Sequence, residues 1–308
     1  MTRLIYDCDP GHDDAIALLL ALASPELELL GVTTVAGNQT LELTTANAIR
    51  ILDHVGRDEV PVSAGASRPL VRRRRVAANV HGDTGLDGPS LPPPSRTPES
   101  AHAVDWTASA ISESSEPVTL VATGPLTNVA LLLARYPEVE QRLDRVVLMG
   151  GAIGEGNVTP AAEFNIWADP EAAARVFEGN LDLTMVGLDV THRALMTPDH
   201  AGRLAGAGPA GRLVAELYDF YSRFHRRRYG WNGAPVHDAV AMAHLLNPTL
   251  LETKHCGVKV DTGPELSRGR TNVDRWGRAG WTPNCHVAVD IDPERFLALL
   301  VDRIGGFA

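Results

Sequence analysis

The chain has 308 residues, 44% of them hydrophobic, and a formal net charge of −10 at pH 7. This length and composition can bury a full core, as one large domain or two small ones, without disulfide support. The acidic balance argues against a nucleic-acid-binding protein, because contacts with phosphate dominate that affinity. No uncharged apolar run approaches the ~18 residues of a membrane span. We therefore expect no nucleic-acid partner and no membrane partner.

Cysteine usage and the first residues bear on the compartment. Three cysteines, Cys8, Cys256 and Cys285, cannot all pair with one another. The sequence does not open with a basic segment, an apolar core and a small-residue cleavage site. We therefore expect a cytoplasmic protein with reduced thiols.

Short apolar runs alternate with segments of helical spacing along the chain. The apolar runs start at Arg3, Leu27, Pro117, Arg145 and Leu181, and turn chemistry follows each, as in buried parallel strands. The helical segments cover residues 13–23, 43–55, 125–137 and 170–179. This alternation predicts an α/β fold with an open, mostly parallel sheet and helices on both faces. We expect residues 1–308 to form a single domain.

Two segments interrupt this rhythm. Residues 67–100 are rich in Pro, Gly and Arg and are too long for a simple connection. Residues 210–233 begin as an amphipathic helix and end in a basic, aromatic tail. We expect active-site flaps near 67–100 and 220–233, and a surface helix is the alternative for the second. The arginine runs 72–75 and 226–228 fit solvated faces or subunit contacts better than ligand sites.

The stretch DCDPGHDDA at residues 7–15 gathers four carboxylates around a Pro-Gly turn at the end of an apolar strand. Ligands of open α/β sheets bind outside the carboxyl ends of strands. Helix capping can explain one or two of the four, but like charges this close repel unless a cation or a proton intervenes. Oxygen ligands without a nearby His or Cys pair favour Ca²⁺ or Mg²⁺ over zinc, and a purely structural role is the alternative.

Other predicted strand ends carry polar groups as well. Each has a simple structural explanation on its own, such as a turn, a helix cap or a surface carboxylate. Their joint occurrence at strand ends favours a common site. The residues are Asn38, Thr123, Met149, Asn157, Glu163, Asn165, His237 and Asp238.

At these residues the sequence resembles the inosine-uridine-preferring nucleoside hydrolase family. The match is ordered and runs through nearly the whole chain, and its first motif is highly specific. The motifs are DCDPGHDDA at 7–15, GN at 37–38, HGDTGLDG at 81–88, ATGPLTN at 122–128, LMGG at 148–151, EFNIWADP at 163–170, APVHDA at 234–239 and SRGRTNVD at 267–274.

The resemblance implies a nucleoside hydrolase-like fold and calcium-dependent hydrolysis of the N-glycosidic bond of small-molecule ribonucleosides, giving ribose and free base. A metal-positioned water would attack the anomeric carbon, with Asp9 as general base. By the same resemblance, one Ca²⁺ would be held by Asp9, Asp14, Asp238 and the backbone carbonyl of Thr123. The ribose would be held by Asp13, Asn38, Glu163 and Asn165, in a pocket lined by Met149 and Asn157.

The resemblance places His237 near the leaving base, as a candidate general acid, and suggests broad or pyrimidine-leaning specificity. His12 is expected to be structural. Aromatic lid candidates that could reach over the base are Tyr221, His225, Tyr229 and Trp231. Relatives are commonly oligomers, so a homodimer or homotetramer is expected.

Two other functions fit parts of the sequence. A Mg²⁺-dependent phosphatase with an aspartyl nucleophile would use the DCD stretch, but the chain has only two lysines, Lys254 and Lys259, and no phosphate loop of the G-x-x-x-x-G-K type. A non-catalytic nucleoside- or sugar-binding protein would not require the full carboxylate set together with His237.

Overall fold

The fold is built on a nine-stranded sheet, seen in a computed structural model that describes residues 1–263 and 265–307. The strand order is β10-β9-β11-β6-β5-β4-β1-β2-β3. Neighbours from β11 to β3 run parallel, whereas β9 pairs antiparallel with β10 and β11. The open, mostly parallel sheet predicted from the sequence is confirmed. The strands are β1 (Thr2–Cys8), β2 (Leu27–Thr34), β3 (Val62–Ala64), β4 (Val118–Ala122), β5 (Leu143–Met149), β6 (Leu183–Val186), β9 (Leu251–Val260), β10 (Thr271–Asp274) and β11 (Cys285–Ile291).

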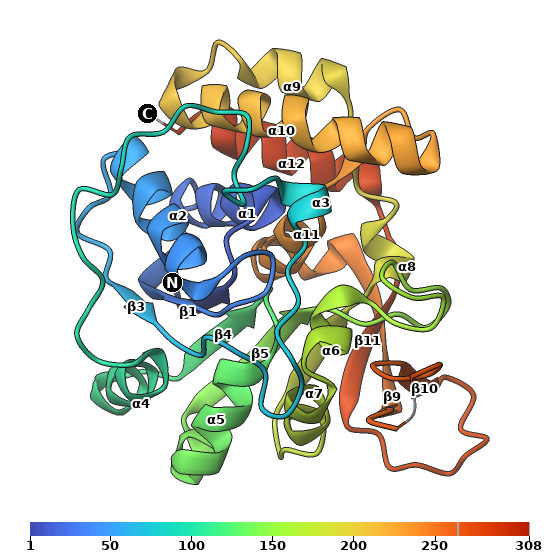
Figure 1. Ribbon diagram of the computed structural model, residues 1–308. Coiled ribbons are helices and arrows are strands. Elements are labelled where there is room, and N and C mark those ends of the chain that lie inside the picture. Colours follow the sequence, from blue (N-terminus) through green and yellow to red (C-terminus); the bar gives the residue numbers. More distant parts are fainter. Residues whose placement is uncertain (264, 308) are drawn as a thin grey trace.

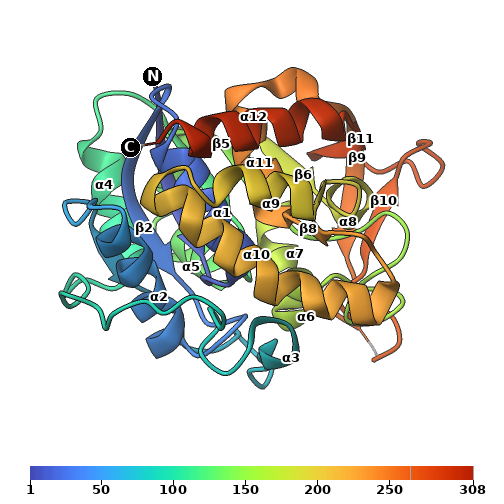
Figure 2. The same cartoon turned by 90° about the horizontal axis from the view of Figure 1, so that it is seen from above.

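Helices cover both faces of the sheet, as Figures 1 and 2 show. One face carries α1 (His12–Leu22), α2 (Leu41–His54), α9 (Pro198–Leu204), α10 (Gly208–Tyr229), α11 (His237–Leu246) and α12 (Pro293–Gly305). The other carries α4 (Ala103–Glu113), α5 (Thr127–Arg135), α6 (Phe164–Ala168) and α7 (Pro170–Phe177). Smaller elements are α3 (Ala78–His81), α8 (Leu188–Thr191), the pair β7 (Leu195–Met196) and β8 (Ala234–Pro235), and 3₁₀ turns at Pro137–Gln141 and Pro248–Leu250.

Covering both faces creates two apolar cores, one on each side of the sheet. Along β1, Leu4 and Tyr6 belong to one core and Ile5 to the other, because successive side chains of a strand point to opposite faces. Strands buried on both faces read as continuous apolar runs, which is why the sequence reveals the central strands so clearly.

The apolar run that starts at Leu181 forms only a short strand, β6. It ends at Val186, and Gly187 leads directly into α8. A Cβ atom at Gly187 would lie 2.9 Å from the carbonyl oxygen of Gly151, so a residue without a side chain is needed where the two segments meet. The strands β9, β10 and β11 were not predicted from the sequence. Side chains 252–255 of β9 are exposed, so this edge of the sheet lacks a continuous apolar run.

The order of the strands creates a topological switch point beside β1. The chain continues from β1 to β2 and β3 on one side, and through β4, β5 and β6 on the other. The carboxyl ends of β1 and β4 therefore border the crevice where ligands of such sheets bind. Asp9 follows β1 and Thr123 follows β4.

The two segments expected as flaps approach each other from distant parts of the chain. Helix α3, within residues 67–100, packs beside α10, as both views show. Residues 220–229 continue α10 to Tyr229, so this part of the segment is a regular helix, as in the alternative named for it. Gly230 ends the helix in a left-handed conformation with φ of 71°. Among the described residues, no helix is both long and apolar enough to cross a membrane.

Candidate active site

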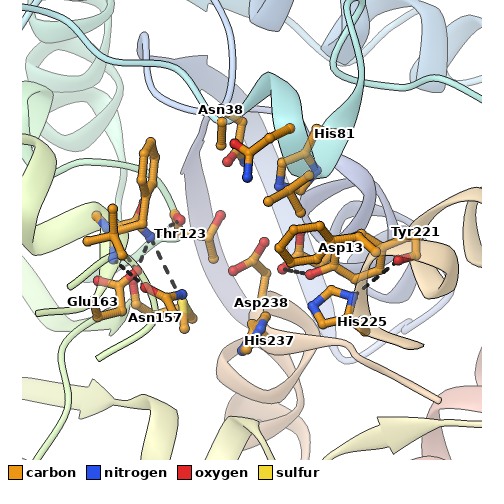
Figure 3. Close-up of a pocket in the computed structure, with 18 of the residues that line it drawn as sticks. Asp13, Asn38, His81, Thr123, Asn157, Glu163, Tyr221, His225, His237 and Asp238 are labelled. Atoms are coloured by element: carbon orange, nitrogen blue, oxygen red, sulfur yellow. Dashed lines mark hydrogen bonds between the residues drawn. The ribbon is translucent and has the colours of Figure 1, made fainter. Parts of the chain in front are cut away.

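Three buried carboxylates converge where β1 and β4 end. Asp13 and Asp14 lie in the first turn of α1, and Asp238 lies in the first turn of α11, which packs against α1. One carboxylate oxygen from each lies within 4.8 Å of the others. Asp238 is 3% exposed, and Figure 3 shows it between Thr123 and Asp13. The structure thus joins the N-terminal acidic turn to a carboxylate that lies far away in the sequence.

Short hydrogen bonds orient Asp14 within this group. Its carboxylate accepts the backbone N–H of Gly11 (3.0 Å), the side-chain amide of Asn38 (3.0 Å) and the hydroxyl of Thr123 (2.8 Å). Asn38, expected at the ribose, also donates to the backbone carbonyl of Asp9 (3.2 Å). Its amide group therefore holds the acidic turn together, and its side chain lines the adjoining cavity.

Asp9 is fully enclosed and lies beside this group of three. Its Oδ2 accepts the backbone N–H of Asn38 at 2.5 Å, whereas its Oδ1 has no hydrogen-bond partner among the described residues. A Cβ atom at Gly37 would come within 2.1 Å of Oδ2, and one at Gly124 within 2.8 Å of Oδ1. Glycine at both positions leaves room for this carboxylate and for a ligand on its free oxygen.

Burial opposes ionisation of these carboxylates. It raises the pKa of Asp13 to about 8, with Asp14 as the next cause, and it raises the pKa of Asp9 and Asp238 well above their usual range. None of the ion pairs among the described residues includes a member of the group. An all-oxygen set with an unpartnered buried oxygen fits a hard divalent cation.

Asp7, the fourth carboxylate of the opening motif, has a different environment. It accepts the Thr33 hydroxyl at 2.6 Å and the side-chain amide of Asn128 at 2.8 Å. These partners belong to β2 and α5, so both bonds tie β1 to adjacent elements, and we expect a structural role for Asp7.

A cavity of about 480 Å³ opens above the carboxylates. Glu163 lies in its wall and is 3% exposed, so its interpretation as a surface carboxylate is wrong. Its carboxylate accepts the backbone N–H groups of Gly151 (3.0 Å), Asn165 (2.8 Å) and Ile166 (3.1 Å), and burial raises its pKa to about 7. The cavity lining also includes the other residues expected at the sugar, namely Asp13, Asn38, Met149, Asn157 and Asn165.

Asn165 connects two strand ends across the cavity wall. Its Nδ2 donates to the carbonyl oxygens of Thr123 (2.6 Å) and Met149 (3.1 Å). The Thr123 carbonyl keeps a second lone pair, so this bond is compatible with a metal ligand at the same oxygen. Asn157 is more exposed, and its Oδ1 accepts the backbone N–H of Phe164 at 3.0 Å.

Histidines and aromatic rings form the opposite wall (Figure 3). His237 lies at the start of α11, and burial, followed by the nearby His192, holds its pKa well below the usual range. Its Nδ1 lies 2.7 Å from the hydroxyl oxygen of Thr191. His225 donates from Nδ1 to the carbonyl of Tyr221 at 3.1 Å, since a carbonyl can only accept, and its neutral ring therefore presents an unprotonated Nε2.

The lid candidates divide into two layers. Tyr221, His225 and Tyr229 line the cavity. Trp231 is absent from the lining and stacks on Tyr229, with ring centroids 4.4 Å apart. His81 and His192 also line the cavity, and neither was predicted from the sequence as a site residue. His81 lies within the quoted motif HGDTGLDG, but no spacing there distinguishes a cavity residue from a turn residue.

His12, expected to be structural, is fully buried and is absent from the cavity lining. Its Nε2 lies 2.9 Å from the carbonyl oxygen of Asp87, and its Nδ1 lies 3.1 Å from Nδ1 of His81. It therefore links the acidic turn to the segment that carries α3.

The fold and this geometry define a class of protein: an open α/β protein whose buried carboxylates lie beneath a cavity lined by amide, carboxylate, imidazole and aromatic groups. The family model of the inosine-uridine preferring nucleoside hydrolases matches residues 4–298. The chain therefore belongs to this family and is a nucleoside hydrolase, an enzyme that acts on N-glycosyl bonds. This assignment replaces the two alternative functions considered for the sequence, a phosphatase and a non-catalytic binding protein.

Named relatives agree with this assignment. The pyrimidine-specific ribonucleoside hydrolase RihA of Shewanella sp. (strain ANA-3) is 52% identical over 303 residues, which cover 98% of this chain and 95% of the relative. RihA of Citrobacter koseri is 49% identical, covering 99% and 98%. Among solved structures, a purine-preferring ribonucleoside hydrolase from Gardnerella vaginalis superimposes with a TM-score of 0.93 at 36% identity, covering 99% of each chain.

The raised carboxylate pKa values predict an unusual pH dependence for the protein without divalent ions. Asp13 titrates near its ordinary value of 3.8 when unfolded and at about 8 when folded. The folded state then binds more protons, so stability is highest at the acidic end of this window and falls as pH rises from about 4 to about 8. Urea unfolding in a chelator should show this fall in the free energy of unfolding, and Asp13→Asn should make it smaller, since Asp9, Asp238 and Glu163 still contribute. A stability that rises over the same window would contradict the argument.

Proposed function

We propose that this nucleoside hydrolase depends on Ca²⁺ and prefers pyrimidine ribonucleosides. One observation carries the proposal: Asp9, Asp13, Asp14 and Asp238 are buried together, and no ion pair among the described residues includes any of them. They lie beneath a cavity whose lining includes amide and carboxylate groups. A hard cation would neutralise this group, and a ribose has the hydroxyls that such a lining binds.

Four oxygen donors would hold the ion: Asp9, Asp14, Asp238 and the backbone carbonyl of Thr123. The unpartnered Oδ1 of Asp9 and the free lone pair of Thr123 support this set. Asp13 lies close enough to share the ion, and its place in the cavity lining also supports the predicted contact with ribose. When bound, the ion would supply positive charge that attracts sugar hydroxyls and makes a nearby water more acidic.

Asp9 would accept a proton from the attacking water. Its second oxygen is held by Asn38, which keeps the carboxylate in one orientation. Cleavage of the N-glycosidic bond builds positive charge on the ribose, so the surrounding carboxylates and amide oxygens stabilise the transition state more than the bound nucleoside. Glu163 and Asn165 lie in the wall where this charge would develop.

His237 would interact with the base as it leaves with the bond electrons. The depressed pKa of this histidine means that the ring is neutral, so it assists by donating a hydrogen bond from a ring N–H. The flanking rings of Tyr221, His225 and Tyr229 supply surfaces against which a flat base packs.

We also infer a cytoplasmic enzyme that forms a homodimer or homotetramer. All three cysteines are buried and unpaired, although Cys256 and Cys285 face each other in neighbouring strands, which fits a reducing compartment. Light scattering coupled to gel filtration measures the oligomeric state directly.

Removal of the Asp9 carboxylate should abolish most of the activity. A positioned general base contributes about 10²- to 10⁴-fold, so Asp9→Ala should lose at least this factor in kcat and should bind Ca²⁺ more weakly by isothermal titration calorimetry. Asp58→Ala, at an exposed position, is the control. Near-normal hydrolysis by Asp9→Ala would exclude its assigned role.

His237→Ala should distinguish leaving groups. We expect turnover of uridine to fall by about 100-fold or more, because the base then departs without a donor. Turnover of 4-nitrophenyl riboside should change little, since that leaving group needs no such assistance. The control is His54→Ala, at the far end of α2. Equal losses on both substrates would remove His237 as the group that assists departure.

The base preference requires a direct comparison. The names of the RihA relatives support a pyrimidine preference, whereas a structural neighbour is described as purine-preferring. We expect kcat/KM for uridine and cytidine to exceed that for inosine and adenosine by about tenfold or more, equivalent to about 1.4 kcal/mol of transition-state binding. The release of free ribose, followed for each nucleoside, measures it, and equal values would reject the preference.

A further inference from the structure

A buried threonine outside the cavity contacts His237, the histidine that we propose to assist the leaving base. Thr191 is the last residue of α8 and is fully buried. Its hydroxyl oxygen lies 2.7 Å from Nδ1 of His237, at the start of α11. Either atom can be the donor in such a contact, so the direction of the bond must come from the surroundings of the two groups.

The surroundings of Thr191 determine that direction. Among the described residues, His237 is the one hydrogen-bond partner of the hydroxyl group. If His237 donated from Nδ1, the buried hydroxyl hydrogen of Thr191 would have no acceptor, which is unfavourable. If Thr191 donates to Nδ1, its hydrogen is satisfied. A neutral imidazole then carries its own hydrogen on Nε2.

The ring of His237 has little freedom to escape this arrangement. His192, the residue after Thr191, packs against it edge to face, with ring centroids 5.5 Å apart. The ring lines the cavity, and no described residue bonds its Nε2. The nitrogen opposite the threonine contact is therefore available to a ligand.

We propose that Thr191 is a positioning residue that donates to Nδ1 of His237 and so keeps the ring hydrogen on Nε2, from where this N–H points to the leaving base. The proposal rests on the proposed role of His237 and adds the residue that sets it. A histidine in the other tautomer would present a lone pair to an increasingly negative base and would oppose its departure.

Two substitutions separate the hydroxyl from the shape of the side chain. Thr191→Val keeps the branched shape and removes the hydroxyl, whereas Thr191→Ser keeps the hydroxyl. In ¹⁵N-histidine NMR of the full-length protein, with His237 assigned by its absence in His237→Gln, we expect a hydrogen on Nε2 in the wild type and in Thr191→Ser. Thr191→Val should lose this single tautomer. A hydrogen on Nδ1 in the wild type, or an unchanged tautomer in Thr191→Val, would overturn the proposal.

Kinetics supply the second readout. Residues that orient metal-bound histidines typically contribute on the order of 10- to 100-fold. We expect a factor of this size here, so kcat of Thr191→Val on uridine should fall accordingly with KM little changed. Thr191→Ser should restore most of the rate, and 4-nitrophenyl riboside should be turned over at a similar rate by all three proteins. A Thr191→Val enzyme with wild-type kcat on uridine would contradict the positioning role.

Failure of the proposed role of His237 and failure of the proposed role of Thr191 give different results. If His237→Ala lost activity equally on both substrates, His237 would not assist the leaving base. The NMR comparison would still decide whether Thr191 sets the tautomer, because it does not depend on turnover.

Discussion

The enclosure of four carboxylates at one sheet edge is the constraint on which the rest of the site depends. Like charges in a region without water repel, and burial favours their protonated forms. Neighbouring groups reduce the unfavourable free energy of this burial. Asn38, Gly11 and Thr123 donate hydrogen bonds to Asp14, and glycines leave space around Asp9. These contacts leave the negative charge without a partner, and a divalent cation is the counter-ion that we propose for it.

The sheet topology makes this enclosure possible. Because β1 and β4 are neighbours at the switch point, the acidic turn after β1 and Thr123 after β4 meet at one crevice. Helix α11 then brings Asp238 against α1 and carries His237 beside it. The proposed metal ligand Asp238 and the histidine proposed to assist the leaving base are thus consecutive residues at one helix start, so one rigid element positions both halves of the proposed reaction.

Most of the fold could be predicted because strands buried on both faces are recognisable in the sequence as continuous apolar runs. The strands from Leu181 onward were harder to predict from the sequence. Side chains 252–255 of β9 are exposed, so this strand has no continuous apolar run. The apolar run from Leu181 ends as a strand before Gly187, which lies close to Gly151 and leads into a helix. In the site, the acidic motif pointed to its own chemistry. His81 and His192 gave no such signal, because a single histidine becomes a cavity residue only through its neighbours in space.

The sequence by itself determined the alternation of strands and helices, the acidic turn and the ordered motifs of the family, since these depend on local pattern and composition. The tertiary structure alone decided that Asp13 lies with Asp14 and Asp238, that Asp9 keeps an unpartnered oxygen and that Trp231 packs behind Tyr229. It also brought Thr191 to His237. The physical reason is that burial and hydrogen-bond partners come from segments far apart in the chain, and these partners set the charge and the tautomer of each side chain.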